Sequence, residues 1–138
     1  MKGAGLSKNE RLVSQKLINE LFLSGQSKSL TAFPLRAVYM QLPTRGCAKG
    51  GFVGTQILIS VPKKRLKHAV DRNRVKRQLR EAYRRNKQLL HDGLPQDYRL
   101  LVAFIWLSNE LSPTSEVEER MVRLLKKIAA KGVKKFEV

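Results

Sequence analysis

Basic side chains gather in one stretch of the chain, and their type and spacing suit the binding of phosphate groups. Between Lys63 and Lys87 there are 12 Lys and Arg residues, opposed only by Asp71 and Glu81. Both cations neutralise phosphate charge, and the planar guanidinium of Arg can also donate two parallel hydrogen bonds to phosphate oxygens. The chemistry that this stretch predicts is the binding of a polyanion, with nucleic acid as the leading partner.

Helical spacing brings several of these cations onto one surface. If residues 68–90 form a helix, a single arc of that helix carries Lys76, Arg77, Arg80, Arg84 and Lys87. Like charges at positions i and i+4 destabilise a helix by about 0.2–0.5 kcal/mol per pair, and solvated helix faces usually intersperse Glu among them. Because this arc lacks that mixture, we favour a contact surface for a polyanion over an ordinary solvated face.

Composition and hydrophobic pattern argue against partners other than RNA or DNA. The 138 residues include 28 Lys and Arg against 11 Asp and Glu, a net charge of +17, and 42% are hydrophobic. This size predicts one RNA-binding domain over residues 1–138, with flexible ends at 1–8 and 132–138. A membrane surface could attract the same charge, but the longest apolar run, 100–107, is too short to span a bilayer. We therefore expect no membrane partner and no small-molecule substrate.

The cellular compartment follows from cysteine usage and from the first residues. Cys47 is the only cysteine, so no internal disulfide can form. The first residues show no secretory signal, because no apolar segment follows Met1. A reducing cytoplasm is the expected location.

Residues that could make the protein itself a catalyst are sparse. His68 and His91 stand 23 positions apart, without a neighbouring His or Cys at metal-ligand spacing. Ser60 and Lys63 match a Ser-x-x-Lys pattern but lack the motifs that accompany it in serine enzymes. The predicted strands carry almost no carboxylates that could hold two metal ions. We predict no catalytic residue and no protein-bound metal.

The hydrophobic pattern predicts the elements that hold the basic stretch. Helices are expected at 9–24, at 68–90 and from about 112 onward, and strands at 33–41, 55–61 and 98–107. The expected buried stripes are Val75, Leu79, Ala82, Tyr83 and Leu90 in the second helix and Val117, Met121, Leu124 and Ile128 in the third. Residues 42–51, with Pro and three Gly, are expected to form a mobile connection. Helices interleaved with strands indicate an α+β or α/β domain of two layers.

Several motifs in and around the basic stretch resemble one protein family. They are Ser60-Val61-Pro62-Lys63-Lys64, Ala69-Val70, Arg72-Asn73-Arg74-Val75-Lys76-Arg77 and Leu79-Arg80-Glu81-Ala82-Tyr83. In this order and spacing, from strand through basic turn to helix, they resemble the signature region of the bacterial ribonuclease P protein subunit. A weaker similarity to that family covers nearly the whole chain.

The resemblance implies a fold and a function. The fold would be α+β, a two-layer αβββαβα sandwich resembling the ribosomal protein S5 domain 2-like fold, with a left-handed βαβ crossover that breaks the usual handedness rule. The function would be 5′ maturation of precursor tRNA by an endonuclease whose catalytic RNA is the partner of this protein. In that family the RNA subunit performs the hydrolysis, so Mg²⁺ is expected in the holoenzyme through RNA and no cofactor is expected on the protein alone.

The resemblance also assigns residues to two sites. The RNA-binding motif would comprise Lys63, Lys64, Arg72, Asn73, Arg74, Lys76, Arg77 and Arg80, and the helical arc adds Arg84 and Lys87. A cleft for the 5′ leader would lie between the first helix and the sheet, where Phe22 matches an aromatic position of the family. Ile18 and Arg36 stand where the family has aromatic residues, and Phe33 or Tyr39 could supply stacking instead.

Two other functions stay open on the residues alone. A ribosomal or RNA-assembly protein could use the same sheet and basic helix without a role in cleavage. A self-sufficient metal-dependent nuclease would instead cleave RNA without a partner.

Overall fold

The structure, a computed structural model, describes residues 11–12, 15–23, 25, 27–42, 54–92 and 99–131. The predictions for the two ends, for the connection after residue 42 and for Cys47 therefore lie outside the described residues.

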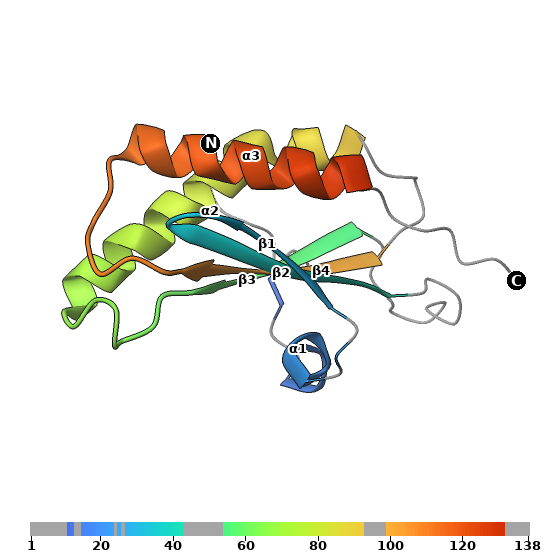
Figure 1. Cartoon of the computed structure of the whole chain (residues 1–138), viewed down its shortest axis with the longest axis horizontal. Helices are drawn as coiled ribbons and strands as arrows, with labels where there is room; N and C mark the ends of the chain where they lie inside the picture. The colour runs from blue at the N-terminus through green and yellow to red at the C-terminus, as the bar shows by residue number, and fades with distance from the viewer. Residues whose placement is uncertain are drawn as a thin grey trace, which may run out of the picture.

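The described residues form three helices and four strands (Figure 1). They are α1 (Gln15–Leu23), β1 (Lys28–Ala32), β2 (Leu35–Leu42), β3 (Gly54–Ser60), α2 (Ala69–Asp92), β4 (Arg99–Trp106) and α3 (Thr114–Lys131). This order confirms the α+β class and the αβββαβα arrangement.

The four strands form one sheet in the order β1-β2-β4-β3. The pairs β1–β2 and β2–β4 are antiparallel, whereas β3 runs parallel to β4 and is joined to it through α2. Residues 100–104 of β4 are all buried, which confirms the interior strand that the apolar run predicts. Of the described strands, β1 and β3 form the two edges.

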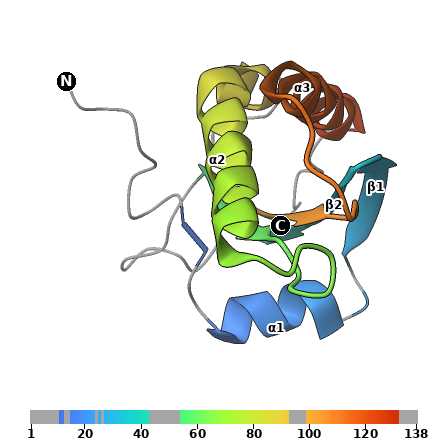
Figure 2. The same ribbon diagram turned by 90° about the vertical axis from the view of Figure 1, so that its left-hand side faces the viewer.

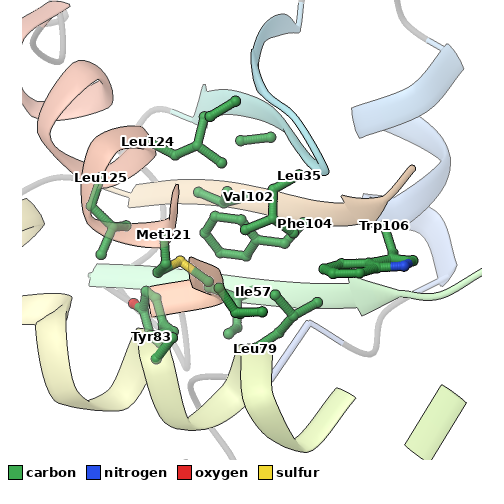
Figure 3. Close-up of a cluster of buried hydrophobic side chains, with 14 of the residues drawn as sticks. Leu35, Ile57, Leu79, Tyr83, Val102, Phe104, Trp106, Met121, Leu124 and Leu125 are labelled. Carbon is green, nitrogen blue, oxygen red and sulfur yellow. The ribbon is translucent and has the colours of Figure 1, made fainter. Parts of the chain in front are cut away.

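The main core lies between the sheet and the layer formed by α2 and α3 (Figures 1 and 3). The predicted stripes of both helices are buried as expected, at Val75, Leu79, Ala82, Tyr83 and Leu90 and at Val117, Met121, Leu124 and Ile128. Phe104 is fully buried in this core, with its ring centroid 6.1 Å from that of Tyr83. The residues that fix α2 to the sheet therefore leave its basic arc on another side.

Helix α1 covers part of the opposite face of the sheet (Figure 1). There Leu21 is completely buried in a smaller cluster with Leu12, Val38, Met40, Leu101 and Ala103. The two layers of the expected sandwich are thus the sheet and the α2–α3 pair, and α1 packs from the other side.

At two of the boundaries that differ from the pattern-based expectation, the difference has a structural cause. Helix α1 begins at Gln15 and not at Asn9. Arg11 instead pairs with Ile57 at the edge of β3, where the Leu12 amide donates to the Ile57 carbonyl over 2.8 Å. The expected strand at 33–41 begins only at Leu35, because Phe33 and Pro34 form the turn of a hairpin whose first arm, β1, the hydrophobic pattern missed.

Candidate nucleic-acid interface

The basic stretch begins in the turn that joins β3 to α2. The Arg65 and Leu66 amides both donate to the Pro62 carbonyl, over 3.0 and 3.3 Å, and the Leu66 side chain is buried in the main core. The turn is thereby anchored while Lys63 and Lys64 stay exposed. The protein presents these two ammonium groups on a held backbone, which lowers the entropy lost when they bind a partner.

Arg72 lies inside the motif but has a structural task. One Nη of its guanidinium donates to the carbonyls of Leu66 and Lys67 over 2.9 and 2.8 Å. Arg72 therefore ties the first turn of α2 to the preceding basic turn. Its place in the RNA-binding motif stays a prediction, and its observed contacts orient the neighbouring cations.

The first half of α2 carries its cations toward solvent. Asn73, Arg74, Arg77 and Arg80 are exposed, and Lys76 is half-buried. Helix α3 packs along one side of α2 (Figure 2), so the outward arc of α2 is the side on which a large partner can dock. Within the part of the chain that the structure describes, none of these exposed arginines forms an ion pair with a carboxylate.

The second half of α2 differs, because its arginines are engaged by carboxylates. Arg84 donates to both carboxylate oxygens of Glu81, with a shortest distance of 2.8 Å, and Nη1 of Arg85 lies 3.7 Å from Glu118 of α3. The hydrogen bonds from Arg84 lower the pKa of Glu81, and the same contact raises the pKa of Arg84. The ten residues predicted to bind RNA therefore include two kinds of cation. Some, such as Arg77, are exposed without a carboxylate partner among the described residues, whereas Arg84 is already paired with a carboxylate.

Glu81→Gln should release Arg84 and strengthen polyanion binding. The depressed pKa keeps Glu81 ionised at neutral pH, so the pair persists until the pH falls through that lowered value. We expect the variant to leave a heparin column at higher salt than Glu20→Gln, which changes the net charge equally but lies on α1. Identical elution of the two variants would show that Glu81 does not restrain Arg84.

The predicted leader cleft would lie on the face of the sheet that α1 only partly covers (Figure 1). Cross-strand pairing places Thr31, Arg36, Ile105 and Ser60 in one row across all four strands. Alternation puts this row on the same face as Val38 and Ala103, which pack under α1. Thr31 and Arg36 are exposed and the other two are half-buried, so this end of the face is open.

The predicted cleft residues separate into those near this face and those elsewhere. Ile18 of α1 is partly buried and packs against the smaller cluster, and Phe22 is 42% exposed at the end of that helix. Tyr39 cannot line the same surface, because alternation along β2 directs it into the main core, where burial raises the pKa of its hydroxyl. Phe33 is exposed in the β1–β2 turn, where its carbonyl accepts from Arg120 of α3 over 2.9 Å.

Sequence reasoning missed some of the residues that border these surfaces. Ile105, Thr31 and Ser60 were not singled out for the cleft, and Arg11 was not placed beside the basic helix. The signal for Ile105 was its even spacing from Ala103 in β4. The position of Arg11 needed the long-range pairing with Ile57, which carries no local pattern.

Comparison with known proteins identifies the family. The model of the Ribonuclease P family matches residues 6–129. The chain belongs to this family. It is 43% identical over 126 residues to the ribonuclease P protein component of Porphyromonas gingivalis, covering 91% of this chain and 87% of that one. The corresponding protein of Chlorobium phaeobacteroides is 36% identical over 131 residues, covering 89% and 87%.

Solved ribonuclease P proteins share the fold. The protein from Thermotoga maritima superposes with a TM-score of 0.62 at 25% identity, covering 86% of this chain and 97% of that one. The Staphylococcus aureus protein gives a TM-score of 0.57 at 19% identity, covering 86% and 94%, which shows the fold alone. Membership confirms the resemblance. As a member of this family, the chain is part of a ribonucleoprotein endoribonuclease of tRNA processing and has an RNA partner.

Two further observations concern the described residues only. They contain no group of three or more His, Cys, Asp or Glu side chains placed to hold a metal ion. None of their helices has the length and apolar character needed to cross a membrane.

Proposed function

We propose that this ribonuclease P protein binds the RNA subunit through the turn at 63–67 and the first half of α2, and that the RNA subunit performs the hydrolysis. The observation that supports this most is a set of exposed cations on the anchored turn and the helix that follows it, at Lys63, Lys64, Lys67, Arg74, Arg77 and Arg80. Each phosphate that these groups neutralise releases condensed counterions, which drives association. We call this set the exposed basic surface.

The proposed role in catalysis is to support the metals of the RNA. Mg²⁺ in the holoenzyme would be held by RNA phosphates, and the cations of the exposed basic surface would reduce the repulsion among those phosphates. Ammonium and guanidinium groups cannot ligate a cation, so they stabilise the folded RNA without competing for its ions.

Precursor tRNA is the second proposed partner, through its 5′ leader. The open row of the sheet offers Arg36 for phosphate contacts, and Phe22 offers a ring on which a base can stack. Ile18 packs into the smaller cluster and supplies an apolar wall. This arrangement binds a single strand by charge and shape, with fewer stacking positions than the family pattern has.

Phe22→Ala should weaken the binding of precursor tRNA to the holoenzyme. Stacking contributes about 1–3 kcal/mol per base, which corresponds to a loss of roughly fivefold or more in affinity. Because Phe22 is partly exposed, the free energy of unfolding should change by less than about 1 kcal/mol.

The matched control is Leu23→Ala, which removes an apolar side chain that is 77% exposed at the same helix end. We expect it to leave affinity unchanged. Substrates with a leader of one nucleotide should bind both variants equally well. If Phe22→Ala weakens binding of mature tRNA as much as that of precursor tRNA, the leader assignment is wrong.

Reconstitution tests the proposed function as a whole. Precursor tRNA is incubated in low Mg²⁺ with the protein, with the RNA subunit and with both. We expect cleavage only with both components. Cleavage by the protein alone would make it a self-sufficient nuclease, and tight binding to ribosomal RNA without any effect on tRNA cleavage would indicate an assembly role.

A further inference from the structure

A pocket opens at the outer edge of β3, where the residues before α1 meet the basic helix. It is lined by Arg11, Leu12, Ile57, Leu58, Ile59, Lys76 and Arg80, and its volume is 410 Å³. Pockets that hold small molecules have volumes of about 300–1,000 Å³. The space therefore matches a compact ligand or one residue of a polymer, and it adjoins the exposed basic surface through Arg80.

The lining combines cations with an apolar base. Leu12 and Ile57 are each 3% exposed and belong to the two separate clusters, so they close the pocket from behind. The apolar floor that a ligand can reach is Ile59, which is half-buried and packs on the α2 side of the sheet. Arg11 and Arg80 are exposed at the rim, and Lys76 is half-buried between floor and rim. Among the described residues of the lining there is no carboxylate, so none of them neutralises the three positive charges. An anionic group at the rim joined to a flat apolar group on the floor would satisfy both parts.

The strand edge adds hydrogen-bonding groups to the same place. The Leu12 amide donates to the Ile57 carbonyl over 2.8 Å, so the peptide groups of Ile57 point away from β4. Because backbone direction alternates along a strand, the N–H and C=O of Ile59 point to that side too. Ile59 lines the pocket, so a donor and an acceptor lie at its wall.

We propose that this pocket binds one unstacked nucleotide of a single-stranded RNA segment. Its phosphate would lie among Arg11, Lys76 and Arg80, its base would lie against the side chain of Ile59, and the edge of the base would meet the peptide groups of that residue. The inference rests on the proposed RNA-binding function and extends it from phosphate contact to contact with a base.

A ligand that offers only a phosphate would leave the apolar floor uncovered. An RNA duplex could not cover it either, because its bases are stacked inside the helix. An acidic peptide could also meet three cations, but it would need a strand-like stretch along β3, where Arg11 and Leu12 already pair. The nucleotide therefore fits the described groups better, and the peptide is kept as an outcome of the test.

The test is an NMR titration of the full-length ¹⁵N-labelled protein with adenosine 5′-monophosphate, with uridine 5′-monophosphate and with ribose 5-phosphate, which lacks a base. We expect the amides of Leu12, Ile57 and Ile59 to shift with both nucleotides, and ribose 5-phosphate to bind at least about fivefold more weakly because it cannot cover the floor. Arg11→Ala should weaken nucleotide binding about three- to tenfold, since it removes one charge-assisted contact. Lys16→Ala, an exposed cation on α1, should not.

Each remaining outcome counts against the proposal. If ribose 5-phosphate binds as tightly as the nucleotides, the pocket is a general anion site. If the amide resonances do not shift with nucleotide, the pocket does not bind nucleotides. Tighter binding of an oligo-glutamate peptide than of nucleotides would assign it to a protein partner.

Failure of the pocket is separable from failure of the proposed function. Wild-type protein and Arg11→Ala are also titrated with the RNA subunit and with a single-stranded RNA hexamer. The comparison shows whether the bound nucleotide comes from the RNA subunit or from a separate single strand. If nucleotides leave the pocket amides unchanged while the RNA subunit still binds in a salt-dependent way, only the pocket is rejected. If the RNA subunit does not bind wild-type protein, the proposed function itself is rejected.

Discussion

Arg77→Ala combined with Arg80→Ala is expected to weaken binding of the ribonuclease P RNA subunit by about tenfold to a hundredfold. Both side chains are exposed on the outward arc of α2. Each lost phosphate contact should also reduce the slope of log K against log salt concentration by roughly 1. The measurement is filter binding of the RNA subunit at several salt concentrations.

The same helix provides the control for this experiment. Arg84→Ala combined with Arg85→Ala removes the same charge, but from side chains that contact Glu81 and Glu118. We expect a loss of less than about threefold, because these guanidiniums must leave a carboxylate before they can bind phosphate. Equal losses in the two double variants, or an unchanged salt slope in the first, would show that exposure does not define the docking surface.

Phe104→Ala is expected to lower the free energy of unfolding by about 3–5 kcal/mol. Phe104 is completely buried on the central strand and its ring packs against Tyr83 of α2. Figure 3 shows it between the side chains of α2 and those of α3. Its removal leaves a cavity under the helix that carries the basic surface. Urea denaturation, followed by circular dichroism, measures the change.

Phe33→Ala is the matched substitution at a surface position, since that ring is 62% exposed. We expect it to cost less than about 1 kcal/mol. Below the unfolding transition, Phe104→Ala should retain RNA binding, because the cations themselves are unchanged. Similar stability losses at the two positions would mean that the core is not where the structure places it.

The parts of the fold that could be predicted are those in which one face of an element is buried. The stripe of Val75, Leu79 and Tyr83 follows the helical period, so the hydrophobic pattern alone was enough to place the basic arc beside it. The apolar run of β4 likewise predicted a strand covered on both faces. Only the resemblance to the family implied an additional strand before the basic helix, which is β1 in the structure; the hydrophobic pattern did not predict it.

The parts that could not be predicted depend on contacts between distant segments. Strand β1 is short and mostly exposed, with only Ala32 buried, so it has no clear alternation to detect. The contact of Arg85 with Glu118 joins two helices and has no local signal. Tyr39 was ambiguous because α1 lies on one face of β2 and the main core on the other, and both faces carry apolar residues.

Lysine footprinting on the bound complex tests the central claim most directly. The protein is acetylated with and without the RNA subunit, and the modified lysines are quantified by mass spectrometry. Lys63, Lys64 and Lys67 are exposed on the proposed surface, whereas Lys126 and Lys127 are exposed on α3 and serve as internal controls. We predict that RNA protects the first three and leaves the two on α3 reactive. Protection of Lys126 and Lys127 with continued reaction at Lys63, Lys64 and Lys67 would contradict the claim that this surface docks the RNA.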